Sequence, residues 1–165
     1  MAIDYQSFNN PEPVQISFSP YHLKEYNNRW FVFGKNAEYD SLINLALDRI
    51  IKIEEANTAY EPSSIDFEEY FEDTIGVSIL PGREPEKILL RVDISLWPYI
   101  ETKPLHGSQK VKARSEEFVD IALELIPNYE LESLILHFGE KLEVLEPPAF
   151  REKIKSRVEA LFEKY

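Results

Sequence analysis

Short runs of alternating apolar and polar residues fill about the first 60 positions of the chain, a pattern typical of β-strands separated by turns. In residues 14–19, for example, Val14, Ile16 and Phe18 alternate with polar side chains. Similar runs predict strands over 2–8, 29–35, 41–47 and 49–56, and residues 20–28 are predicted to be a loop. No helix in this part is long enough to cover a flat sheet, so we predict a small closed barrel of five strands.

The stretch NNRWFVFGKN, residues 27–36, interrupts this alternation with four large apolar side chains in a row, from Trp30 to Phe33. In a strand, Trp30 and Val32 face one way, and Phe31 and Phe33 face the other. Both faces therefore need apolar cover. One face must fill the barrel, and the other is predicted to meet a ligand or a second domain.

The pattern changes after residue 62. We predict a connecting helix over 65–76, a Pro/Gly-rich linker at 80–86, a strand at 87–94, a helix at 95–103 capped by Ser95, strands at 108–114 and 117–126, a helix at 129–138 ended by Gly139, a strand at 141–146 and an amphipathic helix at 149–165. The order βαββαβ plus a last helix is what a ferredoxin-like half-sandwich requires. We therefore expect an α+β chain with a barrel in 1–62, a connector and linker in 63–86 and a ferredoxin-like domain in 87–165.

Composition agrees with a folded protein, because 44% of the 165 residues are hydrophobic and 13% are aromatic. The net charge of -12 repels nucleic acid as a whole, so any polyanion needs a local basic patch. The absence of cysteine excludes disulfides and thiolate metal sites. No apolar run is long enough to span a membrane and the N-terminus is unlike a signal peptide, so we expect a cytoplasmic protein.

Enzyme chemistry finds little support in the sequence. His22, His106 and His137 lack the spacing of a metal site, and the five glycines are not grouped into a phosphate-binding loop. A hydrolase could use His106 with Ser108, but this pair would also need an orienting acid and an oxyanion site. We predict no enzyme, no cofactor and no metal, and the hydrolase stays open as a third alternative.

Two groups of cations are candidate anion sites. Alternation places Lys110, Lys112 and Arg114 on one face of a strand, about 6–7 Å apart, with Val111 and Ala113 facing inward. They are candidate phosphate contacts, or they guard an edge strand against aggregation. The second group combines rings with cations: Tyr21, His22, Arg29, Trp30, Phe31 and Arg49. Of these, Arg49 lies in the most apolar neighbourhood, and a buried arginine needs an anion.

The segments SPYHL, NNRWFVFGKN and LALDRIIKI, in this order and spacing, resemble the WYL domain of bacterial transcriptional regulators. The Trp-Tyr-Leu motif that names the domain stands here as Trp30-Phe31-Val32. The later segments DFEEYF, PLHGSQK and LEVLEPPAFREKIKSRVEALFEKY resemble the C-terminal extension that accompanies this domain. The resemblance covers nearly the whole chain and rests on the ordered set of segments, since no single motif is specific.

The resemblance implies an Sm/SH3-like barrel followed by a ferredoxin-like extension, and a sensor that binds a nucleotide-type or single-stranded nucleic-acid ligand. Carried onto this sequence, the pocket would use His22, Arg29, Trp30 and Arg49, with Phe31 in the position of the motif tyrosine. Phe31 lacks the tyrosine hydroxyl, and the segment SLINLA lacks a basic residue that members of this family often have there. Both differences weaken the case for anion binding.

Such regulators often form homodimers and bind DNA through an N-terminal winged helix-turn-helix, which we do not find in this sequence. We therefore expect a fragment of a regulator, or a partner that works without its own DNA reader. The alternative function is a pure dimerisation module without a ligand.

Overall fold

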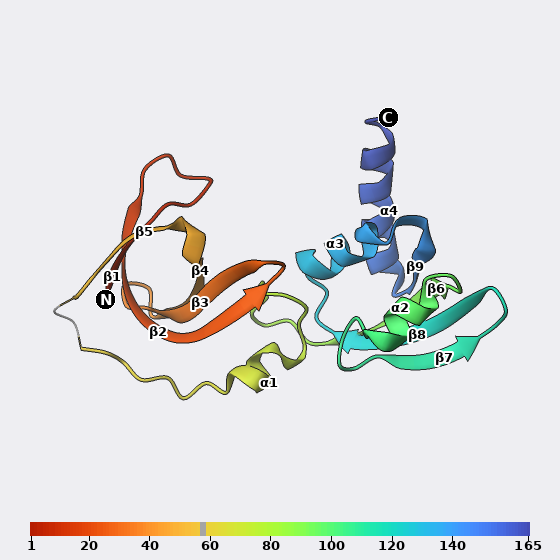
Figure 1. The fold of residues 1–165 in the computed structure, drawn as a ribbon, viewed down its shortest axis with the longest axis horizontal. Helices are drawn as coiled ribbons and strands as arrows, with labels where there is room; N and C mark the ends of the chain where they lie inside the picture. The colour runs from red at the N-terminus through yellow and green to blue at the C-terminus, as the bar shows by residue number, and fades with distance from the viewer. Residues whose placement is uncertain (57–58) are drawn as a thin grey trace. The chain divides into compact units, whose positions relative to one another are not determined.

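The computed structural model describes residues 1–56 and 59–165, and the chain divides into two compact units, Met1–Phe67 and Glu68–Tyr165. Each unit contains one antiparallel sheet (Figure 1). Among the described residues, no helix combines the length and the apolar character needed to cross a membrane.

The first unit is built from five strands: β1 (Ala2–Tyr5), β2 (Val14–Tyr26), β3 (Arg29–Asn36), β4 (Ser41–Ala46) and β5 (Ile50–Glu54). Their order in the sheet is β4-β3-β2-β1-β5. All five strands that the sequence predicts are present, although β1 ends at Tyr5 and is shorter than the predicted 2–8.

The predicted loop over 20–28 is wrong, because most of it belongs to the long strand β2. This strand pairs with β1 through Val14–Ser17 and with β3 through Phe18–Tyr26, with an irregular register after Pro20. Asn27 and Asn28 then form the two-residue turn into β3, both with positive φ (51° and 62°), as a type I′ hairpin turn requires.

A glycine allows β2 and β3 to lie close together next to this irregularity. A Cβ atom on Gly34 would lie 2.3 Å from the ring of Phe18 and 2.3 Å from the carbonyl oxygen of Ser19. Both distances are too short for any side chain, so the sequence needs glycine here to let β2 pass over β3.

The sheet of the first unit is open, and the prediction of a closed barrel is wrong. Within residues 1–56 and 59–67, no ladder joins the two edge strands β4 and β5. A short 3-10 helix, η1 (Leu47–Arg49), connects them instead. Positions 47–49 therefore form a corner, which takes the edge of the sheet from β4 to β5 and holds the predicted site residue Arg49.

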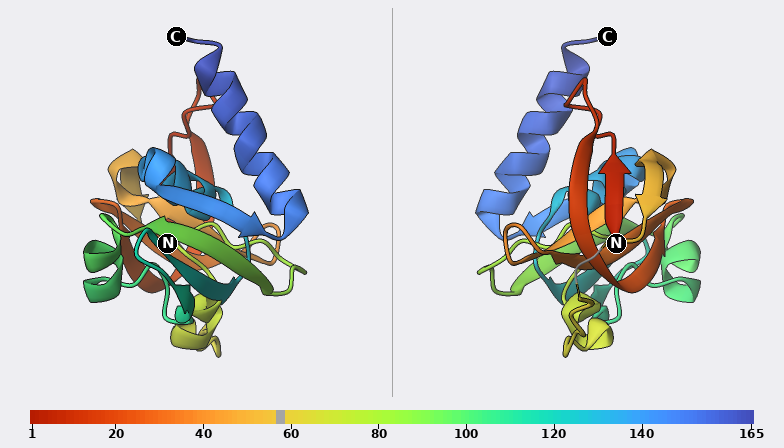
Figure 2. Two further views of the ribbon diagram at one scale, coloured as in Figure 1. Left: turned by 90° about the vertical axis from the view of Figure 1, so that its right-hand side faces the viewer. Right: turned by 90° about the vertical axis from the view of Figure 1, so that its left-hand side faces the viewer.

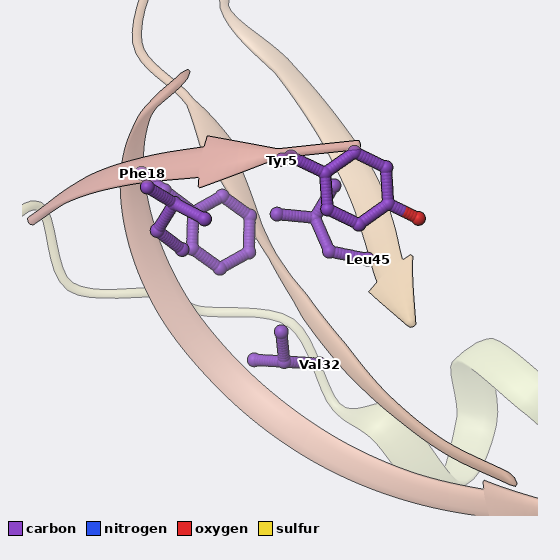
Figure 3. Packing of buried hydrophobic residues seen from close by; sticks show 5 residues of the cluster. Tyr5, Phe18, Val32 and Leu45 are labelled. Atoms are coloured by element: carbon purple, nitrogen blue, oxygen red, sulfur yellow. The ribbon is translucent and has the colours of Figure 1, made fainter. Parts of the chain in front are cut away.

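The core of the first unit lies inside the curve of this sheet. Ile3, Tyr5, Phe18, Val32 and Leu45 form one buried cluster, and the last four are labelled in Figure 3. Burying such a side chain stabilises the fold by about 1.5–3 kcal/mol. The hydroxyl of Tyr5 also accepts a hydrogen bond from the backbone N–H of Ala46 (3.3 Å), which attaches the end of β4 to the core.

The second unit contains the predicted βαββαβ order with an additional helix at each end. Its elements are α1 (Phe67–Glu72, which begins at the last residue of the first unit), β6 (Glu86–Asp93), α2 (Trp97–Thr102), β7 (Lys110–Arg114), β8 (Phe118–Leu125), α3 (Tyr129–His137), η2 (Gly139–Lys141), β9 (Leu142–Glu146) and α4 (Pro148–Phe162). The strand order is β7-β8-β6-β9. Gly139 follows α3 with a φ of 58°, as the predicted helix stop requires. The predicted cap at Ser95 is wrong, because α2 starts after Leu96 and has no side-chain cap.

One face of the second sheet is apolar because alternate residues of its two central strands, β6 and β8, are apolar and lie on the same face. Ile88, Leu90 and Val92 on β6 are fully buried, as are Val119, Ile121 and Leu125 on β8. Helices α3 and α4 contact β9 and each other. Helix α4 is the long blue helix in Figure 2, and its last turns extend past the sheet of this unit.

The start of α3 fixes the segment that follows α1. Asn128, which is 1% exposed, accepts the N–H of Leu131 and donates to the carbonyl oxygens of Ile75 (2.8 Å) and Ser78 (3.1 Å). Oε1 of the buried Glu130 accepts from the backbone and hydroxyl of Ser78. Residues 75–78 are therefore held by α3. The sequence predicts the connecting helix to continue to residue 76, but α1 ends at Glu72.

Candidate functional site

The corner formed by η1 gathers two of the predicted cations. Arg29, at the start of β3, lies 3.3 Å from the carboxylate of Asp48 through its Nε atom. The side chains of this pair are 40% and 49% exposed, so solvent weakens the attraction. Arg29 can therefore turn toward a ligand at small cost. Arg29 was predicted from the sequence as a site residue and Asp48 was not, although its position beside Arg49 was an available signal.

Arg49 is the cation with an unused donor. Its Nε atom is buried and has no hydrogen-bond partner among the described residues. Its guanidinium carbon lies 3.8 Å from the ring centroid of Phe8, a cation–π contact. Its backbone carbonyl accepts the N–H of Gln6 (3.0 Å). The backbone is thus fixed by β1 and the turn after it, and the guanidinium group can still bind an anion.

Phe8 is a site residue that sequence reasoning missed. It lies in the turn between β1 and β2, and 75% of its surface is exposed. A large apolar side chain in a polar turn was the signal that could have identified it. In the structure the guanidinium group of Arg49 lies over this ring, so Phe8 and Arg49 present a ring and a cation together.

Trp30 and Phe31 point to opposite faces of β3, as alternation predicts. Trp30 is 52% exposed and lies opposite Glu25 on β2. The same face carries Leu23, which is 54% exposed, and Val32, which is in the core. Trp30 therefore continues the core face of the strand into solvent, where an apolar ring can stack on it.

Phe31 and His22 belong to the other face. Phe31 lies opposite Lys24, and burial lowers the pKa of the Lys24 amine. The ring of His22 stacks on that of Phe67 with centroids 4.6 Å apart and 9° between the planes. The structure therefore does not bring the five predicted residues onto one face. Trp30 lies on one face of the sheet, and Phe31 and His22 lie on the other. Lys24 was missed because residues 20–28 were predicted to be a loop.

Lys35 of the first unit is already neutralised by two carboxylates. Lys35 lies 2.5 Å from a carboxylate oxygen of Asp40 and 2.5 Å from one of Glu61. These carboxylates raise the pKa of the Lys35 amine, chiefly through the hydrogen bond to Asp40. Among the described residues of this unit, Arg49 is the cation whose buried donor has no hydrogen-bond partner.

His106 and Ser108 lie at a cavity of about 430 Å³ in the second unit, with Glu72, Asp73 and Glu124 in its lining. The Nδ1 atom of His106 lies 2.8 Å from the Ser108 hydroxyl oxygen and also accepts the N–H of Ser108. The same hydroxyl oxygen accepts the N–H of Glu124 (2.8 Å). These bonds close a turn and attach it to β8.

A catalytic pair would need a third residue that orients the imidazole. Throughout residues 1–56 and 59–165, no carboxylate is hydrogen-bonded to His106. In the same ranges, no group of three His, Asp or Glu side chains is arranged for a metal ion. The geometry therefore gives the hydrolase alternative no support beyond the proximity of the two side chains.

The basic strand β7 differs from its prediction. All five of its residues are exposed, including Val111 at 53%. Val111 lies opposite the buried Ile121 on the core face, whereas Ala113 lies opposite Asp120 on the other face, so the two do not both face inward. The register with β8 shifts between Val111 and Ala113, which leaves Lys112 in a bulge. Lys110 and Arg114 consequently lie on opposite faces, and the predicted single basic face is wrong. Phosphate contact by these side chains stays a prediction.

Comparisons with known proteins match both parts of the chain. Residues 1–55 match the WYL domain family, and residues 84–162 match the WCX domain family. One similar solved structure is that of the proteasome accessory factor B/C (PafBC) of Arthrobacter aurescens, with 15% identity and a TM-score of 0.42. The match covers 99% of this chain and 24% of that one, and similarity at this level carries no argument about function. No curated protein matches the sequence.

Proposed function

We propose that this chain, which belongs to the WYL-domain proteins and carries a WCX domain after its WYL domain, is the ligand-sensing part of a transcriptional regulator. The ligand is a nucleotide or a single-stranded nucleic acid, bound at the η1 corner. In this proposal the chain senses a ligand and does not catalyse a reaction. The regulator would act in the bacterial cytoplasm, on DNA that a helix-turn-helix domain binds.

The buried, unpartnered Nε atom of Arg49 carries this proposal. A buried donor without an acceptor costs about 1–3 kcal/mol, and a phosphate oxygen would remove this cost. Arg29 is held at the same corner by its ion pair with Asp48 and offers a second guanidinium group. Together the two arginines suit a phosphodiester, whose oxygens accept several charge-assisted hydrogen bonds.

Exposed rings favour a ligand with bases over inorganic phosphate. Trp30 is half exposed and Phe8 lies over Arg49, so both have a ring face on which a base can stack. Stacking is worth about 1–3 kcal/mol per base and tolerates any sequence. His22 and Phe31 lie on the other face of the strands, so we propose that they support the fold of this site and that Phe8 contacts the ligand in their place.

The test is a titration with labelled oligothymidine and with single nucleotides at several salt concentrations. Arg49→Ala is expected to weaken binding at least tenfold and to reduce the salt dependence, because one cation–phosphate contact is lost. Arg49→Lys keeps the charge but lacks the fork of donors, so it should restore only part of the affinity. Arg83→Ala, an exposed arginine of the second unit, is the matched control. The assignment fails if no ligand binds at low salt, or if Arg49→Ala and Arg83→Ala behave alike.

Homodimerisation without a ligand is the second candidate, and helix α4 favours it. Ile154 is buried, but Val158, Leu161 and Phe162 on the same side are 47%, 52% and 81% exposed. The spacing 154, 158, 161 is that of a helix-pairing seam. Sedimentation over a dilution series should show a dimer that Leu161→Glu dissociates. A chain that stays monomeric at high concentration would exclude this function.

We also propose the finer fold assignment and the domain division predicted from sequence. The strand order β4-β3-β2-β1-β5 with a 3-10 turn before β5 supports an Sm/SH3-like domain in 1–62. The order β7-β8-β6-β9 supports a ferredoxin-like domain in 87–165, after a connector in 63–86. Expression of 1–62 and 63–165 as separate chains tests the division: each should fold cooperatively by itself.

A further inference from the structure

Strand β7 is an open edge of the second sheet. It is the last strand in the order β7-β8-β6-β9 and pairs with β8 alone. Its five residues, Lys110–Arg114, are all exposed. An exposed edge strand presents unpaired N–H and C=O groups, which are a template for another extended chain.

The opposite edge of the same sheet is closed. A guanidinium nitrogen of Arg151 on α4 donates to the backbone carbonyl of Val144 on β9. Another lies 2.7 Å from the carboxylate of Glu143. A chain arriving at β9 would have to displace this side chain, so β7 is the edge of this sheet that can accept a strand.

The charge of β7 is not compensated within the protein. Lys110, Lys112 and Arg114 form no ion pair in the part of the chain that the structure describes. The acid that β8 places opposite this strand, Asp120, already binds Arg91 through both carboxylate oxygens (2.8 and 2.9 Å). By contrast, the exposed edge strand β5 pairs its Lys52 with Glu54 at 2.8 Å. Three free cations on one edge therefore favour an acidic partner.

The bulge decides between a peptide and a phosphate backbone. Lys110 lies opposite Ala122, and Arg114 lies opposite Val119, so the two cations face opposite sides of the sheet. A polyphosphate chain that follows one face can reach only part of this charge. An added β-strand sends its side chains alternately to both faces, so acidic residues can reach cations on each.

We propose that β7 binds an acidic extended peptide, which adds to the sheet as a fifth strand. Backbone hydrogen bonds to the free edge of β7 supply affinity, and acidic side chains on both faces pair with Lys110, Lys112 and Arg114. The exposed Val111 supplies an apolar contact for one residue of the peptide. This site lies in the WCX domain and does not depend on ligand binding at Arg49.

Fluorescence anisotropy with a labelled peptide of two Glu-Glu-Val-Val repeats, which places acidic residues on both faces of a strand, tests this proposal. The comparison probe is the same peptide N-methylated at two successive central residues, which keeps the charge but removes a donor facing β7. The variant Lys110→Gln/Lys112→Gln/Arg114→Gln changes exposed side chains only and is expected to fold. The matched control, Arg83→Gln/Lys141→Gln/Lys164→Gln, removes the same charge elsewhere on the second unit.

The unmodified peptide is expected to bind, and both N-methylation and the β7 variant should weaken binding roughly tenfold or more. Equal binding of the N-methylated peptide would reduce the effect to charge and overturn the proposal. The same holds if the control variant loses as much affinity, or if no peptide binds at low salt. Oligothymidine binding that depends on the β7 residues, without peptide binding, would assign the edge to phosphates. A concentration-dependent dimer lost in the β7 variant would assign it to a second copy.

Discussion

Replacing Asn128 by alanine should destabilise the second unit more than the loss of a helix cap does. Asn128 is buried and makes three hydrogen bonds: it caps α3 through Leu131, and it donates to the carbonyls of Ile75 and Ser78. Losing the cap costs about 1 kcal/mol. Each lost side-chain bond to a carbonyl costs about 0.5–1.5 kcal/mol. The sum is about 2–4 kcal/mol, a large part of the 5–15 kcal/mol typical of a domain.

Asn128→Asp separates the two roles of this residue. Aspartate caps a helix as well as asparagine does, so capping alone predicts no loss of stability. A carboxylate cannot donate to the carbonyls of Ile75 and Ser78 and repels them. If Asn128 holds residues 75–78 as described, the aspartate variant should be at least as unstable as the alanine variant.

Urea unfolding followed by tryptophan fluorescence measures both variants. The chain has two tryptophans, and in a Trp30→Phe background the buried Trp97 reports on the second unit alone. Asn9→Ala, in an exposed turn of the first unit, is the control and should leave this transition unchanged. An alanine variant that loses less than about 0.5 kcal/mol, or an aspartate variant as stable as wild type, would refute the reasoning.

Three further outcomes are expected. Gly34→Ala should destabilise the first unit by about 1–3 kcal/mol or more, seen as a lower unfolding temperature, because the added Cβ has no room. Gly107→Ala, where the added Cβ meets open space, is the control and should be close to neutral. Equal effects of the two substitutions would contradict the close approach of β2 and β3. The hydrogen bonds from Lys35 and Ser95 lower the pKa of Asp40 and Asp93, so stability is gained above their unfolded pKa of about 3.9 and lost as pH falls through the lower folded values. The melting temperature should therefore fall less between pH 7 and pH 2 in Asp40→Asn and in Asp93→Asn than in wild type. Glu132→Ala should lower the free energy of unfolding, measured in urea, by about 1–3 kcal/mol, because the buried carboxylate binds Lys153 and Arg157 of α4 at 2.5 and 3.0 Å. An unchanged urea midpoint would contradict a role of Glu132 in joining α3 to α4.

Alternation and helical spacing predicted most elements of this fold, because each element buries one regular face. The clearest success is β6, where Ile88, Leu90 and Val92 are fully buried. The second half of strand β2, from Pro20 to Tyr26, was missed because residues 20–28 begin with proline and are mostly polar, which is typical of a loop. Its pairing with β3 outweighs this local preference, and the irregular register beside Pro20 accommodates the missing N–H.

The site was predicted in part, and the missing parts depend on contacts between distant segments. Alternation already placed Trp30 and Phe31 on opposite faces, but the resemblance to WYL domains grouped them in one pocket. The contact of Phe8 with Arg49 forms only when β1 and β5 pair, so no local pattern contains it. The bulge at Lys112 likewise depends on the register with β8, and it separates cations that strict alternation places together.

The guanidinium group of Arg151 on the carbonyl of Val144 also limits how this sheet can grow. A sheet with two free edges can be extended indefinitely, one molecule after another, into a fibre. Here the Arg151 side chain covers one edge, so a molecule that pairs through β7 has no second free edge of this sheet to offer to the next. We therefore expect edge-to-edge pairing of this sheet to stop after a single pairing, a restriction that works against fibril growth through this sheet.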